Sequence, residues 1–197
     1  MSIKVYTSLL LIVFGFLLSY GQKIYSTNEI LKTFPLKKST KVKIISYNID
    51  FIGEYALIPP PPNRQLDSVQ LKEYYESLKK PVKLKEVISH GDLNAIQQSK
   101  TLTVAETFEL TKLLFNTCGK FTGGNYRISK CFFPRNAILF YNENDEVFDF
   151  LEICFECDRI EALSDKATEI NYMCDTFFRK LESFFRNKGL QTQYIRN

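Results

Sequence analysis

Residues 136–155 decide the fold and read NAILFYNENDEVFDFLEICF. Two apolar runs, residues 136–141 and 146–155, enclose the turn-forming residues 142–145, and this pattern predicts a β-hairpin. Both runs carry apolar side chains on both faces, which is typical of strands that are covered on each side. We therefore predict that this hairpin lies in the centre of a sheet.

Further strands are predicted from alternating apolar and polar side chains. The alternation is found in residues 40–49 and 82–89, and a further strand is predicted over residues 51–58 with Gly53 as a bend or bulge. Prolines 59–62 fix an extended chain that cannot join a sheet. They predict a stiff surface connector, with a docking site for a proline-binding partner as the alternative.

The predicted helices cover residues 67–79, 104–116 and 171–188. Asp67 and Thr103 each begin a capping-box pattern at the start of the first two helices. Helical spacing places Leu71, Tyr74, Tyr75 and Leu78 on one face of the first. Residues 39–197 are thus predicted to form a single α+β domain, a mostly antiparallel sheet with a central hairpin and about three packed helices.

The first 21 residues are typical of a secretory signal peptide. Lys4 precedes an apolar run from Val5 to Leu18, and Ser19-Tyr20-Gly21 supplies small residues where a signal peptidase cleaves. The run of about 14 residues is short for a membrane helix of roughly 20 residues. We expect cleavage after residue 21 and no membrane span in the mature chain; an uncleaved anchor is the alternative. Residues 22–38 carry little pattern and predict a loosely ordered N-terminal arm.

The formal net charge of the whole chain, +4, is too small to indicate a nucleic-acid partner. The lysines at 37, 38, 41 and 43 form a short basic run without an aromatic platform, which predicts a solvated strand face. We expect no nucleic-acid binding.

Five cysteines, at 118, 131, 154, 157 and 174, predict disulfides if the chain is exported, and the odd number leaves at least one unpaired. If Tyr141 faces Glu146 in the hairpin, Cys131 falls opposite residue 156, and a shift of one residue brings Cys157 opposite. Cys131 is therefore expected within bonding reach of Cys157 or Cys154. The same register places Arg135 opposite Glu152 and predicts an ion pair between them.

Two chemical alternatives involve the same cysteines. Cys154 and Cys157 form a C-x-x-C motif that could serve thiol-disulfide exchange, although the motif ends a strand and no strong helix face follows it. A metal site could combine Cys131, Cys154 and Cys157 with His90, but only one closely spaced ligand pair is present. We expect no catalytic residue, no metal and no cofactor.

The segment Cys131–Tyr141, CFFPRNAILFY, followed by Glu152–Cys157, EICFEC, resembles a pattern in uncharacterised small exported proteins of Bacteroidota. The resemblance covers roughly residues 103–190. It implies a bacterial source and a periplasmic or secreted location, and it implies no particular activity.

These observations favour a non-enzymatic binding or interaction module of the cell envelope, with an envelope or extracellular protein as the partner. The loop around residues 120–127 offers Phe121, Tyr126 and Arg127 for contact, since these residue types are favoured at interfaces. The alternative is a thiol-disulfide redox protein that uses Cys154 and Cys157.

Overall fold

The computed structural model describes residues 24–51, 53, 61, 65–78, 80–91, 93–118, 131–164, 174 and 176–194. The expected signal peptide lies outside these residues, as does most of the strand predicted over residues 51–58. Phe51 and Gly53 are described and lie in no strand.

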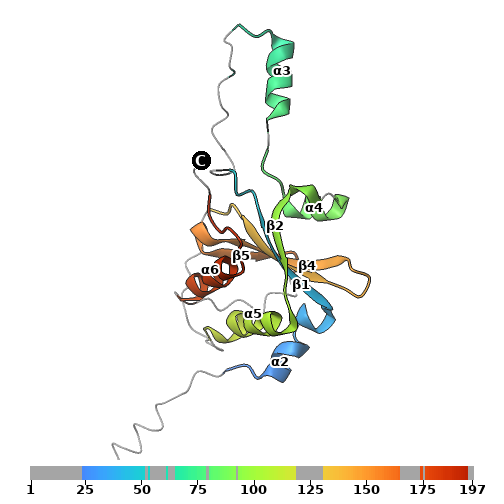
Figure 1. Cartoon of the computed structure of the whole chain (residues 1–197), viewed down its shortest axis with the longest axis vertical. Helices are drawn as coiled ribbons and strands as arrows, with labels where there is room; N and C mark the ends of the chain where they lie inside the picture. The colour runs from blue at the N-terminus through green and yellow to red at the C-terminus, as the bar shows by residue number, and fades with distance from the viewer. Residues whose placement is uncertain are drawn as a thin grey trace, which may run out of the picture.

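One sheet organises the fold, with five strands in the order β2-β1-β3-β4-β5 and antiparallel pairing throughout. The strands are β1 (Lys41–Tyr47), β2 (Ile96–Thr101), β3 (Asn136–Tyr141), β4 (Val147–Cys154) and β5 (Arg159–Ala162). The helices are α2 (Thr27–Lys32), α3 (Ser68–Ser77), α4 (Leu84–His90), α5 (Val104–Asn116) and α6 (Phe177–Asn187), with short 3-10 turns η1 (Leu36–Lys38), η2 (Leu93–Ala95) and η3 (Phe155–Cys157). This is the α+β architecture predicted from the sequence, and β3 and β4 form its central hairpin (Figure 1).

The hairpin turn forms where the sequence predicts it, because Asn142 supports it with its own side chain. The Asn142 side-chain oxygen accepts hydrogen bonds from the backbone N–H groups of Asn144 and Glu146. The register differs from the prediction: Tyr141 faces Val147, and an irregularity between Phe140 and Tyr141 shifts the remaining pairs. Turn residues specify that a hairpin forms, whereas this irregularity decides which residues face each other.

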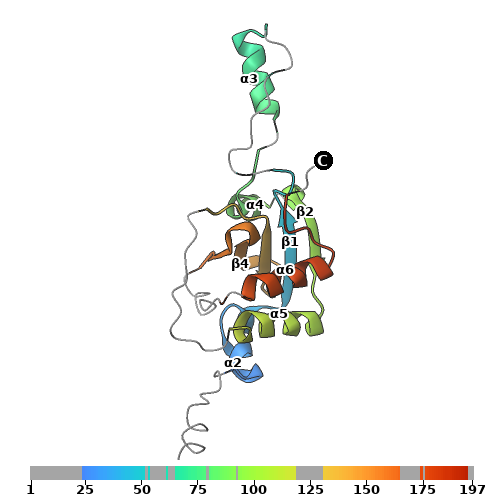
Figure 2. The same ribbon diagram turned by 90° about the vertical axis from the view of Figure 1, so that its left-hand side faces the viewer.

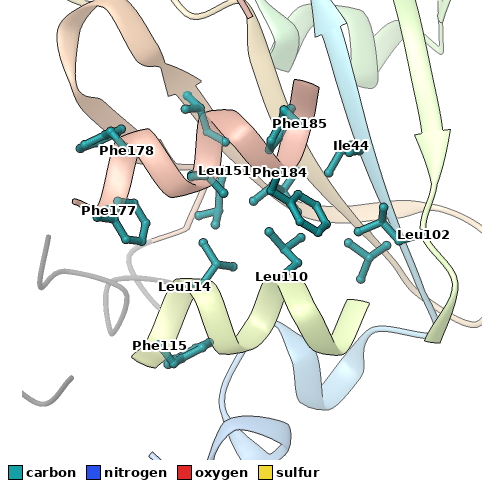
Figure 3. Packing of buried hydrophobic residues seen from close by; sticks show 14 of the residues in the cluster. Ile44, Leu102, Leu110, Leu114, Phe115, Leu151, Phe177, Phe178, Phe184 and Phe185 are labelled. Carbon is teal, nitrogen blue, oxygen red and sulfur yellow. The ribbon is translucent and has the colours of Figure 1, made fainter. Parts of the chain in front are cut away.

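One face of the sheet carries the larger core, under α2, α5 and α6 (Figures 1 and 2). Leu110 and Leu114 of α5 and Phe184 and Phe185 of α6 are buried over Leu151 of the sheet, as Figure 3 shows. Burying each such side chain contributes about 1.5–3 kcal/mol, so this layer carries much of the stability.

The predicted helices on this face have clear local causes. Thr103 and Glu106 form the expected capping box, and α5 has the predicted bounds. The predicted helix 171–188 is shorter in the structure, since α6 begins at Phe177 and Cys174 lies in no helix. Gly189 follows α6 with φ 83°, a left-handed conformation that glycine adopts without strain.

The N-terminal segment differs from the loosely ordered arm predicted over residues 22–38. From residue 24 onward it contains α2 and η1, and Ile30 is buried in the core. Ser26 and Glu29 form a capping box, a local signal that the sequence reading missed. The Asn116 side chain bonds both backbone groups of Tyr25, which ties this segment to α5.

The other face of the sheet packs against α4, where the prediction of a strand over residues 82–89 was wrong. Leu84 and Ile88 pack in the small core on this face, and Val87 is also buried, a spacing that suits a helix. Gly91, with φ 70°, ends this helix in a left-handed conformation. The edge strand β2 lies beside β1 and was not predicted, because its polar residues show little apolar alternation.

Candidate functional site at the base of an inserted arm

An inserted arm, residues 49–81, interrupts the connection between the neighbouring strands β1 and β2. Its described part contains α3, which forms because Asp67 accepts the N–H groups of Val69 and Gln70 in a capping box. None of the α3 residues is buried, and Val69 and Tyr75 are 63% and 41% exposed. Figures 1 and 2 both show α3 standing apart from the sheet and from the other helices.

The helix predicted over residues 67–79 is present as α3, and its apolar face is not buried. Leu71, Tyr74, Tyr75 and Leu78 lie at helical spacing, and none of them is buried: Tyr75 is exposed and the other three are half-buried. Helical periodicity shows that a face is apolar and does not show what covers it.

Asn48 joins the two ends of the arm. Its side-chain nitrogen donates to the backbone oxygen of Val82 over 3.0 Å, and the backbone N–H of Val82 donates to its side-chain oxygen over 2.9 Å. Asn48 is 4% exposed and has φ 55°, a left-handed conformation that asparagine tolerates better than most residues. One side chain thus fixes where the chain leaves the sheet and where it returns.

Arg135, in the segment just before β3, contacts the start of the arm. Its guanidinium donates to the backbone oxygen of Phe51 over 2.7 Å and pairs with Glu156 over 2.6 Å. The guanidinium carbon lies 4.8 Å from the centre of the Phe133 ring. Because Arg135 is 2% exposed, removing Glu156 would take a carboxylate away from a buried guanidinium, which is costly in the protein interior.

Gln97 of β2 completes the contacts at the base. Its side-chain oxygen accepts the N–H of Ile49 over 3.0 Å, and its side-chain nitrogen donates to Asp50 over 2.6 Å. We define the base of the arm as Asn48, Val82, Phe51, Arg135 and Gln97. There, side chains that follow β1, lie in β2 and precede β3 form hydrogen bonds to backbone groups of the arm and its ends.

Two disulfides brace the domain. Cys131–Cys157, with alpha carbons 5.9 Å apart, is one of the two pairings that the sequence left open, and it joins the segments that carry Arg135 and Glu156. Cys118–Cys174, with alpha carbons 5.5 Å apart, joins the chain after α5 to the chain before α6 and was not predicted.

Cys154 is free and buried beside the first disulfide. Burial raises the pKa of its thiol, although backbone N–H groups of Phe133 and Cys157 that donate to the sulfur act in the opposite direction. A thiol-disulfide catalyst needs an accessible thiolate with a lowered pKa. The structure gives Cys154 neither the exposure nor the pKa that this chemistry requires.

Glu152 does not pair with Arg135, contrary to the prediction. Ala137 lies opposite Glu152, because the observed hairpin register differs from the predicted one. The Tyr47 hydroxyl donates to Glu152 over 2.5 Å instead. Burial raises the pKa of both groups; the hydrogen bond from Tyr47 partly offsets this for Glu152, and Glu161 on β5 raises it further.

The residues of the alternative metal site are not brought together. Cys131 and Cys157 are bonded to each other, and His90 is exposed in the last turn of α4 with Nδ1 2.7 Å from the backbone oxygen of Glu86. Among the described residues, no group of three or more His, Cys, Asp or Glu side chains is placed to hold a metal ion.

The predicted contact residues Phe121, Tyr126 and Arg127 lie outside the described residues. The sequence singled out Arg135 but with Glu152 as its partner, and the other residues of the base of the arm were missed. Asn48, directly after an alternating strand, was the available signal, because asparagine is favoured where a chain turns in the left-handed conformation.

No helix in the described part of the chain combines the length and apolar character needed to cross a membrane. Comparison with known proteins gives no match to a family model, to a curated protein or to a solved structure.

Proposed function

We propose that this chain is a non-enzymatic binding module of the cell envelope that contacts a partner protein through α3. The observation that carries the proposal is the exposed position of α3, in which no residue is buried and the apolar side chains of Val69 and Tyr75 are 63% and 41% exposed. An apolar helical face of this kind suits docking into a groove of another protein. Leu71, Tyr74 and Tyr75 supply the contact types, with tyrosine favoured at interfaces.

The base of the arm supports this function. The buried polar side chains of Asn48 and Arg135 form hydrogen bonds to the backbone of the arm. Well-packed apolar side chains at these positions would stabilise the domain as well. Their geometric effect is to fix both ends of the arm. Fixing a binding segment before contact reduces the conformational entropy lost on binding.

The proposed location is periplasmic or secreted. The two disulfides fit an oxidising compartment, where such bonds persist, and the expected signal peptide fits the same address.

The thiol-disulfide hypothesis is the weaker alternative. Cys157 of the C-x-x-C motif is bonded to Cys131, and Cys154 is buried with a raised pKa. An insulin-reduction assay on the purified protein beside a Cys154→Ser variant separates the two functions. Activity that disappears in the variant would favour the redox function.

Site-specific cross-linking tests the contact through α3. A photoreactive residue at Tyr75 is expected to capture one discrete partner in the intact envelope, and Leu71→Ser is expected to abolish the capture. A photoreactive residue at Leu163, an exposed apolar side chain elsewhere on the domain, is the matched control and should capture nothing comparable. Equal capture from both positions, or capture that survives Leu71→Ser, would contradict the proposal.

A further inference from the structure

An apolar groove lies between the N-terminal segment and α5, at the other end of the molecule from α3 (Figures 1 and 2). Its volume, about 670 Å³, falls within the range of roughly 300–1,000 Å³ that is usual for small-molecule sites. Leu31 and Val104 in its lining are 52% and 89% exposed, so apolar surface faces solvent there. The apolar lining is mainly aliphatic and includes Leu31, Leu36, Val42, Leu102, Val104 and Phe108.

The polar side chains of the lining are mostly bonded within the protein. The hydroxyls of Ser39, Thr40 and Thr111 donate hydrogen bonds to backbone oxygens. The ammonium group of Lys41 pairs with Asp145, so mainly the methylene stem of Lys41 is left for the groove. Because these donors are already engaged, the walls suit a ligand whose body is apolar, such as an alkyl chain.

Lysines accompany the groove on both of the segments that line it. Lys37 and Lys38 lie in η1 between the lining residues Leu36 and Ser39, and both are exposed. On α5, the ammonium group of Lys112 lies 4.5 Å from the centre of the ring of Phe108, another lining residue. These lysines place positive charge beside the apolar walls.

The carboxylates closest to these lysines in the chain are engaged elsewhere. Residues 27–43 and 102–112, which include the whole lining of the groove, contain six lysines and three acidic residues. Glu106 and Glu109 both pair with Lys188, over 3.3 and 3.4 Å. Glu29 accepts hydrogen bonds from Ser26 in the capping box of α2.

The hairpin turn at residues 142–146 brings three further acidic residues toward Thr40, but no residue of this turn lines the groove. Asp145 of the turn pairs with Lys41. Within the described residues, Lys37 and Lys38 form no ion pair. η1 thus presents uncompensated positive charge beside an apolar groove, which complements a ligand with an apolar body and an anionic head.

We propose that this groove binds a long-chain fatty acid, with the alkyl chain between η1 and the first turns of α5 and the carboxylate at Lys37 and Lys38. Transfer of the alkyl chain from water to the aliphatic walls supplies affinity. The lysines select an anionic head over a neutral one. The proposal concerns a second surface of the protein and does not depend on the contact through α3.

Fluorescence of cis-parinaric acid, a fatty acid that brightens in an apolar site, tests the proposal on the purified, delipidated exported protein. The wild type is expected to bind this probe saturably. Ala105 lines the groove from the first turn of α5 and is exposed, so Ala105→Trp fills the groove and leaves the core intact. This variant should bind the probe at least about tenfold more weakly. Ser89→Trp, at an exposed position of α4 on the other face of the sheet, is the control and should bind like the wild type.

The methyl ester of the same probe separates charge from apolar contact. Lys37→Gln combined with Lys38→Gln should weaken binding of the acid by roughly three- to tenfold and leave binding of the ester unchanged, because only contacts with the carboxylate are removed. Added salt should have the same selective effect. Lys83→Gln combined with Lys85→Gln removes the same charge from exposed positions beside and on α4 and should change neither affinity.

Absence of saturable binding to the wild type would overturn the proposal, as would undiminished binding to Ala105→Trp. Circular dichroism and melting temperature check the fold of each variant. If Ala105→Trp is unstable, the comparison of acid and ester decides, since it leaves the walls of the groove unchanged. Acid binding that is unaffected in the Lys37 and Lys38 variant, or acid and ester weakened alike, would contradict the assigned head position. A photoreactive residue at Val104 that captures a protein, including a second copy of this chain, while the wild type binds no probe would assign the groove to a protein contact instead.

Discussion

At the scale of single residues, polar side chains decide where the chain leaves and rejoins the sheet. Asn48 holds both backbone groups of Val82 and takes a left-handed conformation to do so. Arg135 and Gln97 hold the adjacent backbone of the arm. The contribution of each of these side chains to the free energy of unfolding can be measured by substitution.

Asn48→Ala should lower the free energy of unfolding by roughly 2–4 kcal/mol, from two lost hydrogen bonds and the strain of a left-handed alanine. Asn48→Gly should lose about 1 kcal/mol less, because glycine adopts this conformation freely. Urea denaturation measures both. Identical losses in the two variants would show that backbone strain plays no part.

Glu106 should make the stability of the folded protein depend on pH. Hydrogen bonding to the backbone of Thr103, together with Lys188, lowers the pKa of Glu106 from 4.5 to about 2. A carboxyl whose pKa is lowered by folding stabilises the folded state above pH 4.5, and this stabilisation is lost as the pH falls through about 2. The stability difference between wild type and Glu106→Gln should therefore shrink over this range in thermal melts. Glu143→Gln, in the exposed hairpin turn, serves as the control, and a difference that stays constant down to pH 2 would contradict the assignment.

Cys154 should be the protected thiol of the described domain. Because it is 1% exposed and burial raises its pKa, iodoacetamide should label it slowly in the folded protein. Unfolding without a reductant should expose this thiol, and peptide mass spectrometry should find the label at Cys154. Label at Cys131 or Cys157 under these conditions would contradict the disulfide between them.

At the scale of elements, α3 and α5 are both capped helices with opposite roles. α5 buries Leu110 and Leu114 against the sheet, whereas α3 buries nothing. The same local signals thus produce a structural helix in one place and an exposed one in another.

Substitution should separate these roles. Leu110→Ala should lower the free energy of unfolding by about 2–5 kcal/mol, because it leaves a cavity in the core. Leu71→Ala on α3 should change it by less than about 0.5 kcal/mol, as is usual for surface positions. Chemical denaturation of both variants gives the comparison, and a large loss in Leu71→Ala would show that α3 is packed in solution.

At the scale of the whole molecule, the two disulfides join segments that are far apart in the sequence. They span 56 residues in Cys118–Cys174 and 26 residues in Cys131–Cys157. The first holds the chain between the two main helices, and the second holds the chain beside the base of the arm.

Removing either bond by replacing both cysteines with serine should lower the free energy of unfolding by about 3–4 kcal/mol, with the longer loop losing slightly more, because the unfolded chain regains its freedom. Denaturation with and without reductant measures this. Reductant should weaken the wild type more than either variant, since the variant has one bond fewer to lose. Equal sensitivity in all three would mean that the bonds do not form.

The sequence alone determined the features whose causes lie within a few residues. The turn at residues 142–145 follows from Asn142 and its neighbours, and α5 follows from Thr103 and Glu106. The two-sided apolar character of β3 and β4 placed them at the centre of the sheet. These signals act locally, so the chain carries them whatever the rest of the fold does.

Only the tertiary structure decided the features that depend on distant partners. The observed register, with Tyr141 opposite Val147 and an irregularity next to Phe140, places Ala137 opposite Glu152, and Arg135 pairs with Glu156. Residues 84–90 form a helix whose Leu84 and Ile88 side chains pack against this face of the sheet. The clamp of Asn48 on Val82 joins positions that come together only once the arm has left the sheet and returned, and spacing along the chain does not specify such a pairing.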